Sequence, residues 1–238
     1  MHEILIANLQ QLLHRDIQHI HQSDGSDVAL AAGRRLEAVA EHAPSFICLL
    51  AEPWLCSEIG EQQRMLLSEC ARIHLYARVL DDAIDEAALI HRQNLLRAQP
   101  MFWQAVQRIG SLVPTAVANE AVVLIAEAVA AVQIDDRQRN PNFWGPKNHH
   151  LLLIPLLLSC DSPKYRKCRS GLSTLIALVQ AGDEWRQGEF YSASMHAKFF
   201  QFLTDCLGVE QLELLSQSGW KGVVERIIWN SHQLLDGL

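Results

Sequence analysis

The sequence lacks the patterns that predict β-structure. Over 238 residues there is no sustained alternation of apolar and polar side chains, and no Asn-Gly or Asp-Gly dipeptide joins two alternating runs. A glycine-rich phosphate loop, a nucleophile elbow, a long heptad run and a fixed-period repeat are also missing. These absences exclude β-rich folds and repeat arrays, and they leave an all-α protein.

Positive charge is also scarce, with 20 Lys and Arg against 27 Asp and Glu and a formal net charge of -7. This balance argues against a nucleic-acid partner. The 6 cysteines form no CxxC pair and the 11 histidines form no HExxH motif. We therefore expect reduced thiols in a cytoplasmic protein, without a disulfide framework or a zinc site.

Long apolar runs are missing as well. The longest, residues 151 to 158, is interrupted by Pro155 and is too short to cross a bilayer. The first residues, Met1-His2-Glu3, contain no basic region typical of a signal peptide. The sequence thus predicts a soluble protein with no transmembrane segment.

Helical periodicity fills most of the chain. An amphipathic segment spans residues 3 to 22, and a break at 23 to 27 leaves Asp27 as the expected N-cap of the next helix. Helical patterns resume near Pro100 and Pro114, where proline suits a first turn. Further helices are expected at 62 to 90, 115 to 137 and 169 to 191. We expect one all-α domain over residues 1 to 238, a bundle of about ten helices.

An acidic stretch, Asp81-Asp82-Ala83-Ile84-Asp85, lies inside a long apolar segment without Pro or Gly. In a helix Asp81 and Asp85 are one turn apart, so the carboxylates crowd one side and repel each other. A segment that is apolar on most of its circumference is a buried helix, in which carboxylates need partners such as water or a divalent cation. The alternative is a solvated acidic face.

Two further segments allow a functional and a plain interpretation. In Gly33-Arg34-Arg35-Leu36, adjacent guanidinium groups suit phosphate oxygens, or they are simply two charges that face solvent. One face near the end of a later helix carries Gln180, Asp183 and Gln187. Either this helix end simply emerges into solvent, or these side chains form part of a functional site. Acids at a helix C-terminus oppose the macrodipole, which favours a role for them.

Taken in this order, the segments resemble the class I isoprenoid synthase family, which includes trans-prenyl diphosphate synthases and class I terpene synthases. Asp81 to Asp85 matches the family's first motif, DDxxD, and residues 180 to 187 look like the second. Residues 33 to 36 are similar to an upstream Gly-Lys/Arg-Arg-Leu segment, and residues 133 to 136 look like a Gln-x-x-Asp. Lys147 lies where a family lysine opens the next helix, so the resemblance covers roughly residues 30 to 190.

The resemblance implies a helical bundle around a central apolar cavity, in which Mg2+ and a prenyl diphosphate substrate bind between two acidic walls. The implied metal ligands are carboxylates and one amide: Asp81, Asp82, Asp85, Asp183, Glu184 and Gln187. Among them, Asp81, Asp82 and Asp183 are the implied catalytic residues. The implied diphosphate-binding residues are Arg34, Arg35 and Lys147. Tyr76, Ala77 and Gln180 would line the pocket, although Tyr76 has the plain alternative of a core residue.

The chain also departs from the family pattern. Glu184 and Gln187 replace aspartates of the second motif, and Glu37 replaces an arginine common in chain-elongating members. The basic loop of those members is also replaced, by residues 188 to 192. These differences favour cyclisation or elimination of a single substrate over transfer to isopentenyl diphosphate or another acceptor. The lost charge at Gln187 also leaves open a non-catalytic, synthase-like subunit or interaction protein. Because family members are often dimers, a homodimer is compatible with this hypothesis.

Overall fold

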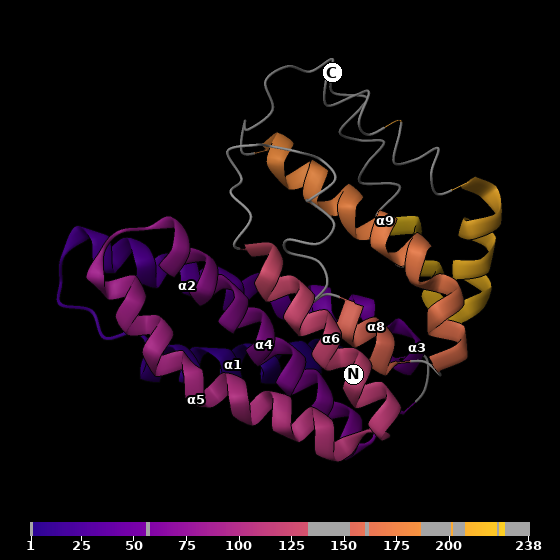
Figure 1. The fold of residues 1–238 in the computed structure, drawn as a ribbon, viewed down its shortest axis with the longest axis horizontal. Helices are drawn as coiled ribbons and strands as arrows, with labels where there is room; N and C mark the ends of the chain where they lie inside the picture. Colours follow the sequence, from indigo (N-terminus) through magenta and orange to yellow (C-terminus); the bar gives the residue numbers. More distant parts are fainter. Residues whose placement is uncertain are drawn as a thin grey trace.

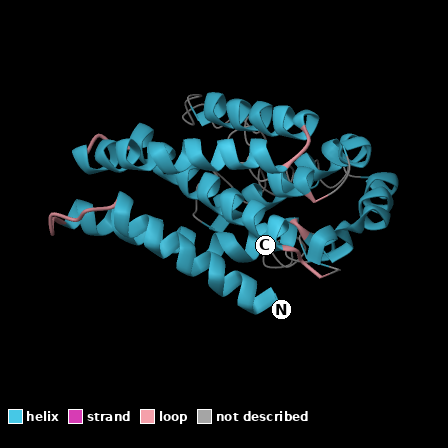
Figure 2. Cartoon of the chain, turned by 90° about the horizontal axis from the view of Figure 1, so that it is seen from below, coloured by secondary structure: helices cyan, strands magenta, loops and turns pink. Residues whose placement is uncertain are grey.

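The computed structural model describes residues 2–55, 58–132, 153–159, 162–186, 201, 208–222 and 224–226. The regular structure in these ranges is helical, and no strand occurs among them (Figure 2). The predicted all-α fold class is therefore confirmed.

Four long helices lie side by side: α1 (His2–Ile20), α2 (Asp27–Leu50), α4 (Glu61–Asp85) and α5 (Leu89–Leu112) (Figure 1). Each buries one apolar stripe at helical spacing, as α1 does with Leu9, Leu13, Ile17 and Ile20. The start of α2 differs by one residue from the expected position. Ser26, not Asp27, is the N-cap, and its hydroxyl accepts a hydrogen bond from the Ala29 N–H at 3.2 Å.

The prediction that Pro100 lies in the first turn of a helix is wrong. Pro100 does not begin a helix but lies inside α5, at an exposed position. A proline ring directed toward solvent leaves the buried face of a helix intact, so the helix continues through it. Pro114 does precede a helix, α6 (Thr115–Val132), and its carbonyl accepts hydrogen bonds from the Val117 and Ala118 N–H groups.

The remaining helices cover one side of this group. The short α8 (Leu153–Leu158) is buried at every residue and contacts α2, α4, α6 and α9 (Ser162–Arg186). Near the C-terminal end of the described chain, a π-helical turn, η2 (Ser216–Trp220), packs on α3 (Glu52–Leu55). The buried Trp220 indole anchors it by donating to the Leu50 carbonyl at 3.2 Å. No helix among the residues described is both long and apolar enough to cross a membrane.

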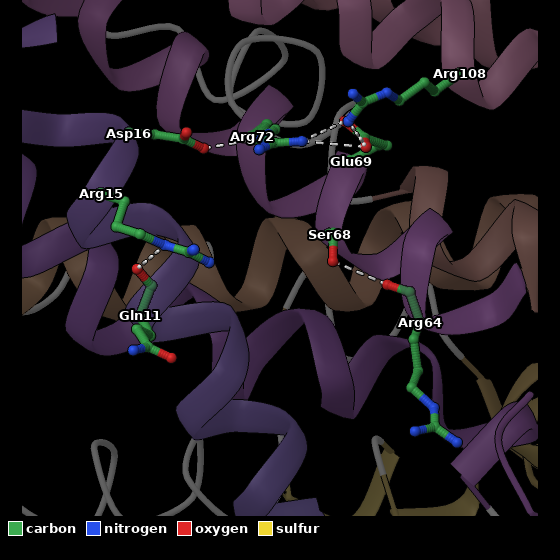
Figure 3. A network of polar contacts seen from close by, with 8 residues as sticks. All are labelled: Gln11, Arg15, Asp16, Arg64, Ser68, Glu69, Arg72 and Arg108. Carbon is green, nitrogen blue, oxygen red and sulfur yellow. Dashed lines mark hydrogen bonds and ion pairs between the residues drawn. The ribbon is translucent and has the colours of Figure 1, made fainter. Parts of the chain in front are cut away.

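A buried ion-pair network joins α1, α4 and α5 (Figure 3). Glu69 of α4 is only 2% exposed and accepts from Arg72 Nη1 at 3.2 Å and Arg108 Nη1 at 2.9 Å. On its other side the Arg72 guanidinium donates through Nε to Asp16 Oδ2 at 2.8 Å. Burial alone lowers the pKa of Arg72, but the hydrogen bond and charge of Asp16, together with Glu69, raise it overall. The network therefore holds charges of both signs inside the bundle.

Candidate functional site

The acidic stretch occupies the last turns of α4, and its aspartates have different surroundings. The Asp82 side chain is 4% exposed and that of Asp81 17%, whereas Asp85, the last residue of α4, faces solvent. Because a buried carboxylate without a partner is very unfavourable, Asp82 must be paired. The expectation that this helix buries charge is met at Asp82 and not at Asp85.

An arginine of the same helix supplies the pairing. Arg78 donates from Nη2 to Asp82 Oδ1 at 2.6 Å, and its Nη1 lies 3.3 Å from Asp81 Oδ2. Sequence reasoning gave no role to Arg78, although its spacing of three and four residues before the aspartates is the spacing at which helical side chains meet. In this structure an arginine offsets the repulsion between Asp81 and Asp82.

A second arginine, from α2, reaches Asp82 and the neighbouring Glu86. Arg35 Nη1 donates to Glu86 Oε1 at 2.9 Å and lies 3.8 Å from Asp82 Oδ1. The hydrogen bond that Arg35 donates to Glu86 is the main cause that raises the pKa of Arg35, and the same bond lowers the pKa of Glu86. The fold thus brings Arg35 to the acidic stretch, while Arg34 beside it is exposed.

Several buried polar atoms at this end of the helices have no hydrogen-bond partner among the described residues. The Nε atoms of Arg35 and Arg78 are among them, as are both ring nitrogens of His91 on α5, a residue that is 1% exposed. Asn94, one turn after His91, places its amide nitrogen 3.2 Å from His21 Nδ1, but its oxygen is unpartnered. An unmet buried donor or acceptor costs about 1–3 kcal/mol, so a further polar contact to any of these atoms would be stabilising.

The pocket residues expected on α4 lie in or beside the core. The Tyr76 ring is stacked on Phe102 of α5 at a centroid distance of 4.0 Å, and its hydroxyl accepts from Gln99 Nε2 at 2.9 Å. These are the contacts of the plain alternative, a core residue of the α4–α5 interface. Ala77 is half-buried and packs against the main hydrophobic core.

The second acidic segment is described in its backbone only. Asp183 and Glu184 belong to the end of α9, but their side chains and that of Gln180 lie outside the described part of the structure. Gln187, Lys147 and the segment 133–136 lie outside the described residues altogether. That Asp81 and Asp183 face each other across a cavity therefore remains a prediction.

Within the described part of the chain, no three His, Cys, Asp or Glu side chains are grouped so that they could hold a metal ion. What the fold does assemble is a five-residue cluster from α2, α4 and the residue after α4: Arg35, Arg78, Asp81, Asp82 and Glu86. We call this set the arginine–aspartate cluster.

Comparison of the chain with protein-family models, with curated proteins and with solved structures gave no match. The relation to class I isoprenoid synthases therefore remains a hypothesis, which depends on the motifs and on their order along the chain.

Proposed function

We propose that this chain is a Mg2+-dependent enzyme that ionises an allylic prenyl diphosphate and gives a cyclised or eliminated terpene. The main support is the arginine–aspartate cluster, because it joins two of the segments on which the family resemblance depends. Arg35 of the Gly33–Leu36 segment lies 3.8 Å from Asp82 of the acidic stretch. In the proposed site, that neighbourhood puts a diphosphate-binding cation beside a metal-binding carboxylate.

The donor atoms of the cluster suit the proposed metal. Mg2+ prefers oxygen ligands and is typically held by one or two carboxylates together with substrate phosphates, and Asp81 and Asp82 offer such oxygens on adjacent residues. In this proposal Asp85 and the side chains of Asp183, Glu184 and Gln187 would complete the two walls. Bound Mg2+ would neutralise charge that develops on the departing diphosphate.

The protein residues would do the remaining work. Arg34, Arg35 and Lys147 would orient the diphosphate and balance its charge as it leaves, since guanidinium groups bind phosphate oxygens in a forked geometry. The apolar side chains around α4 would exclude water from the allylic cation in the proposed central cavity, and aromatic faces could stabilise it.

A non-catalytic role, as a synthase-like subunit or an interaction protein, is favoured by one specific observation. Asp82 is already paired with Arg78 at 2.6 Å, so its buried charge needs no metal for balance. Such an internally neutral cluster can serve as structure alone. Transfer of the allylic group to isopentenyl diphosphate or another acceptor is the alternative within the enzymatic hypothesis.

One assay separates these functions. Purified protein is incubated with geranyl, farnesyl or geranylgeranyl diphosphate and Mg2+, and the released diphosphate is measured with and without isopentenyl diphosphate or an aromatic acceptor. Release without an acceptor supports cyclisation or elimination, and release only with an acceptor supports transfer. If no diphosphate is released and no diphosphate analogue raises the melting temperature in a Mg2+-dependent way, the enzymatic proposal is wrong.

The Asp82→Ala variant connects that activity to the site. We expect it to lose turnover and to keep the helical circular dichroism of the wild type, because both arginine side chains that pair with Asp82 are 36% exposed and can turn toward water. Glu41→Ala, an exposed change on α2, is the control and should keep full activity. Unchanged turnover in Asp82→Ala would remove the acidic stretch from the mechanism.

A further inference from the structure

We propose that Arg78 is an internal counter-ion that excludes a lone divalent cation from Asp81 and Asp82 and releases them only when the cation arrives with a diphosphate. This inference rests on the proposed function and adds to it an order of ligand entry. It starts from the geometry of one guanidinium group, whose two terminal nitrogens lie 3.3 Å from Asp81 Oδ2 and 2.6 Å from Asp82 Oδ1.

The order of charges along α4 is unfavourable for a simple helical ion pair. An acid placed four residues after a base in a helix is the weaker order of an ion pair, and acids near a helix C-terminus oppose the macrodipole. Asp81 and Asp82 are therefore unfavourable in the last turns of α4 unless a cation lies next to them. Arg78 supplies that cation from the preceding turn.

A divalent ion that binds these carboxylates must displace Arg78 or be repelled by it. If the ion enters alone, the guanidinium loses a partner for its charge and gains none. If the ion enters with a diphosphate, the phosphate oxygens offer Arg78 a new anionic partner. Its Nε, which has no partner in the described part of the chain, can donate a further hydrogen bond to them. The same holds for the Nε of Arg35 on the facing helix. The cluster thus favours the metal–diphosphate pair over the metal alone.

The experiment measures metal binding directly, without turnover. Mn2+ serves as the probe, and its free concentration is followed by electron paramagnetic resonance during titration of the full chain. Arg78→Met removes the charge and keeps a long, helix-compatible side chain. Arg15→Met is the matched control, because Arg15 is exposed and, among the described residues, donates only to the Gln11 carbonyl of its own helix at 3.3 Å.

We expect Arg78→Met to bind Mn2+ alone about tenfold more tightly than the wild type, the size expected when a hydrogen bond between two charged groups no longer competes. Arg15→Met should match the wild type. Adding Asp82→Asn to Arg78→Met should abolish the gain, which would assign it to the cluster. With the preformed Mn2+–diphosphate complex as the titrant, Arg78→Met should bind no more tightly than the wild type.

The possible failures are distinguishable. Equal affinity of the wild type and Arg78→Met for Mn2+ alone overturns the counter-ion role, and the proposed function still stands if Asp82→Asn abolishes binding of the Mn2+–diphosphate complex. If no variant binds that complex and the wild type releases no diphosphate, both proposals fall. Should Arg78→Met lose its helical signal, Arg78→Gln provides the same comparison with a neutral side chain that can still hydrogen-bond to the aspartates.

Discussion

Replacing Glu69 by methionine tests how strongly the buried network of Figure 3 holds α1, α4 and α5 together. Glu69 is 2% exposed, and methionine is close to it in length, so the change removes the charge without leaving a large cavity. Its two arginine partners are then left with different environments. Arg108 has a side chain that is 48% exposed and can turn to water, whereas the Arg72 side chain is only 18% exposed.

The magnitude follows from these exposures. A half-exposed ion pair such as Glu69–Arg108 contributes up to about 1 kcal/mol. Arg72 Nη1 is shared between the two carboxylate oxygens of Glu69, a single contact between charged groups that is worth about 1.5–3 kcal/mol, and Arg72 keeps its bond to Asp16. We therefore expect Glu69→Met to lower the free energy of unfolding by about 3 kcal/mol. Arg108→Met should lower it by less than about 1 kcal/mol.

Urea unfolding followed by circular dichroism gives these values, provided that the slope of free energy against urea stays constant. A double-mutant cycle with Arg72→Met isolates the pair, and we expect a coupling of about 2 kcal/mol. A loss below about 0.5 kcal/mol in Glu69→Met, the range of ordinary surface changes, would show that the network is not a stabilising element.

Three other outcomes follow from single buried or half-buried groups. Burial lowers the pKa of His74 from 6.5 to about 4, so the unfolded chain binds the extra proton first. The contribution of His74 to the free energy of unfolding should be fully present above about pH 6.5 and fall by up to about 3 kcal/mol as the pH drops to 4. In the His74→Gln variant the free energy of unfolding should change less with pH over this range. Burial raises the pKa of Cys48 to about 11 and raises that of Cys70 further, so at pH 8 both thiols are protonated and react slowly. Mass spectrometry after alkylation at pH 8 should therefore find both thiols unmodified until urea unfolds the protein. Tyr76→Phe removes the hydroxyl that accepts from Gln99 and should cost about 1 kcal/mol in urea unfolding, and a loss near zero would show that this bond adds nothing.

Much of the local structure could be predicted from the sequence because it depends on neighbours along the chain. The helical spacing of apolar residues gave the helices, and the break at residues 23 to 27 separated α1 from α2. The errors arose where local rules compete. Ser26 and Asp27 are both good caps, and only the backbone geometry decided for Ser26. Pro100 predicted a helix start, yet the packing of Phe102 and Ala105 against the core keeps α5 continuous.

At the candidate site, too, some features could be predicted from the sequence and others depend on how the helices pack. The acidic stretch and the adjacent Arg34 and Arg35 could be recognised as motifs in the sequence. Not all of the residues that pair with these side chains could be recognised. Arg78 was within reach of a spacing argument, since it precedes both aspartates on one helix. No spacing argument could have found the roles of Glu86, His91 and the Glu69 network, because these roles depend on which helices lie next to α4.

By itself the sequence determined that this chain is helical and that carboxylates occur within an apolar helix, because both depend on side-chain spacing along one segment. Only the tertiary structure decided that Asp82 is buried against Arg78 and Arg35. The physical reason is that a buried charge is stable only with a partner, and the partner from α2 becomes a neighbour only after the helices pack.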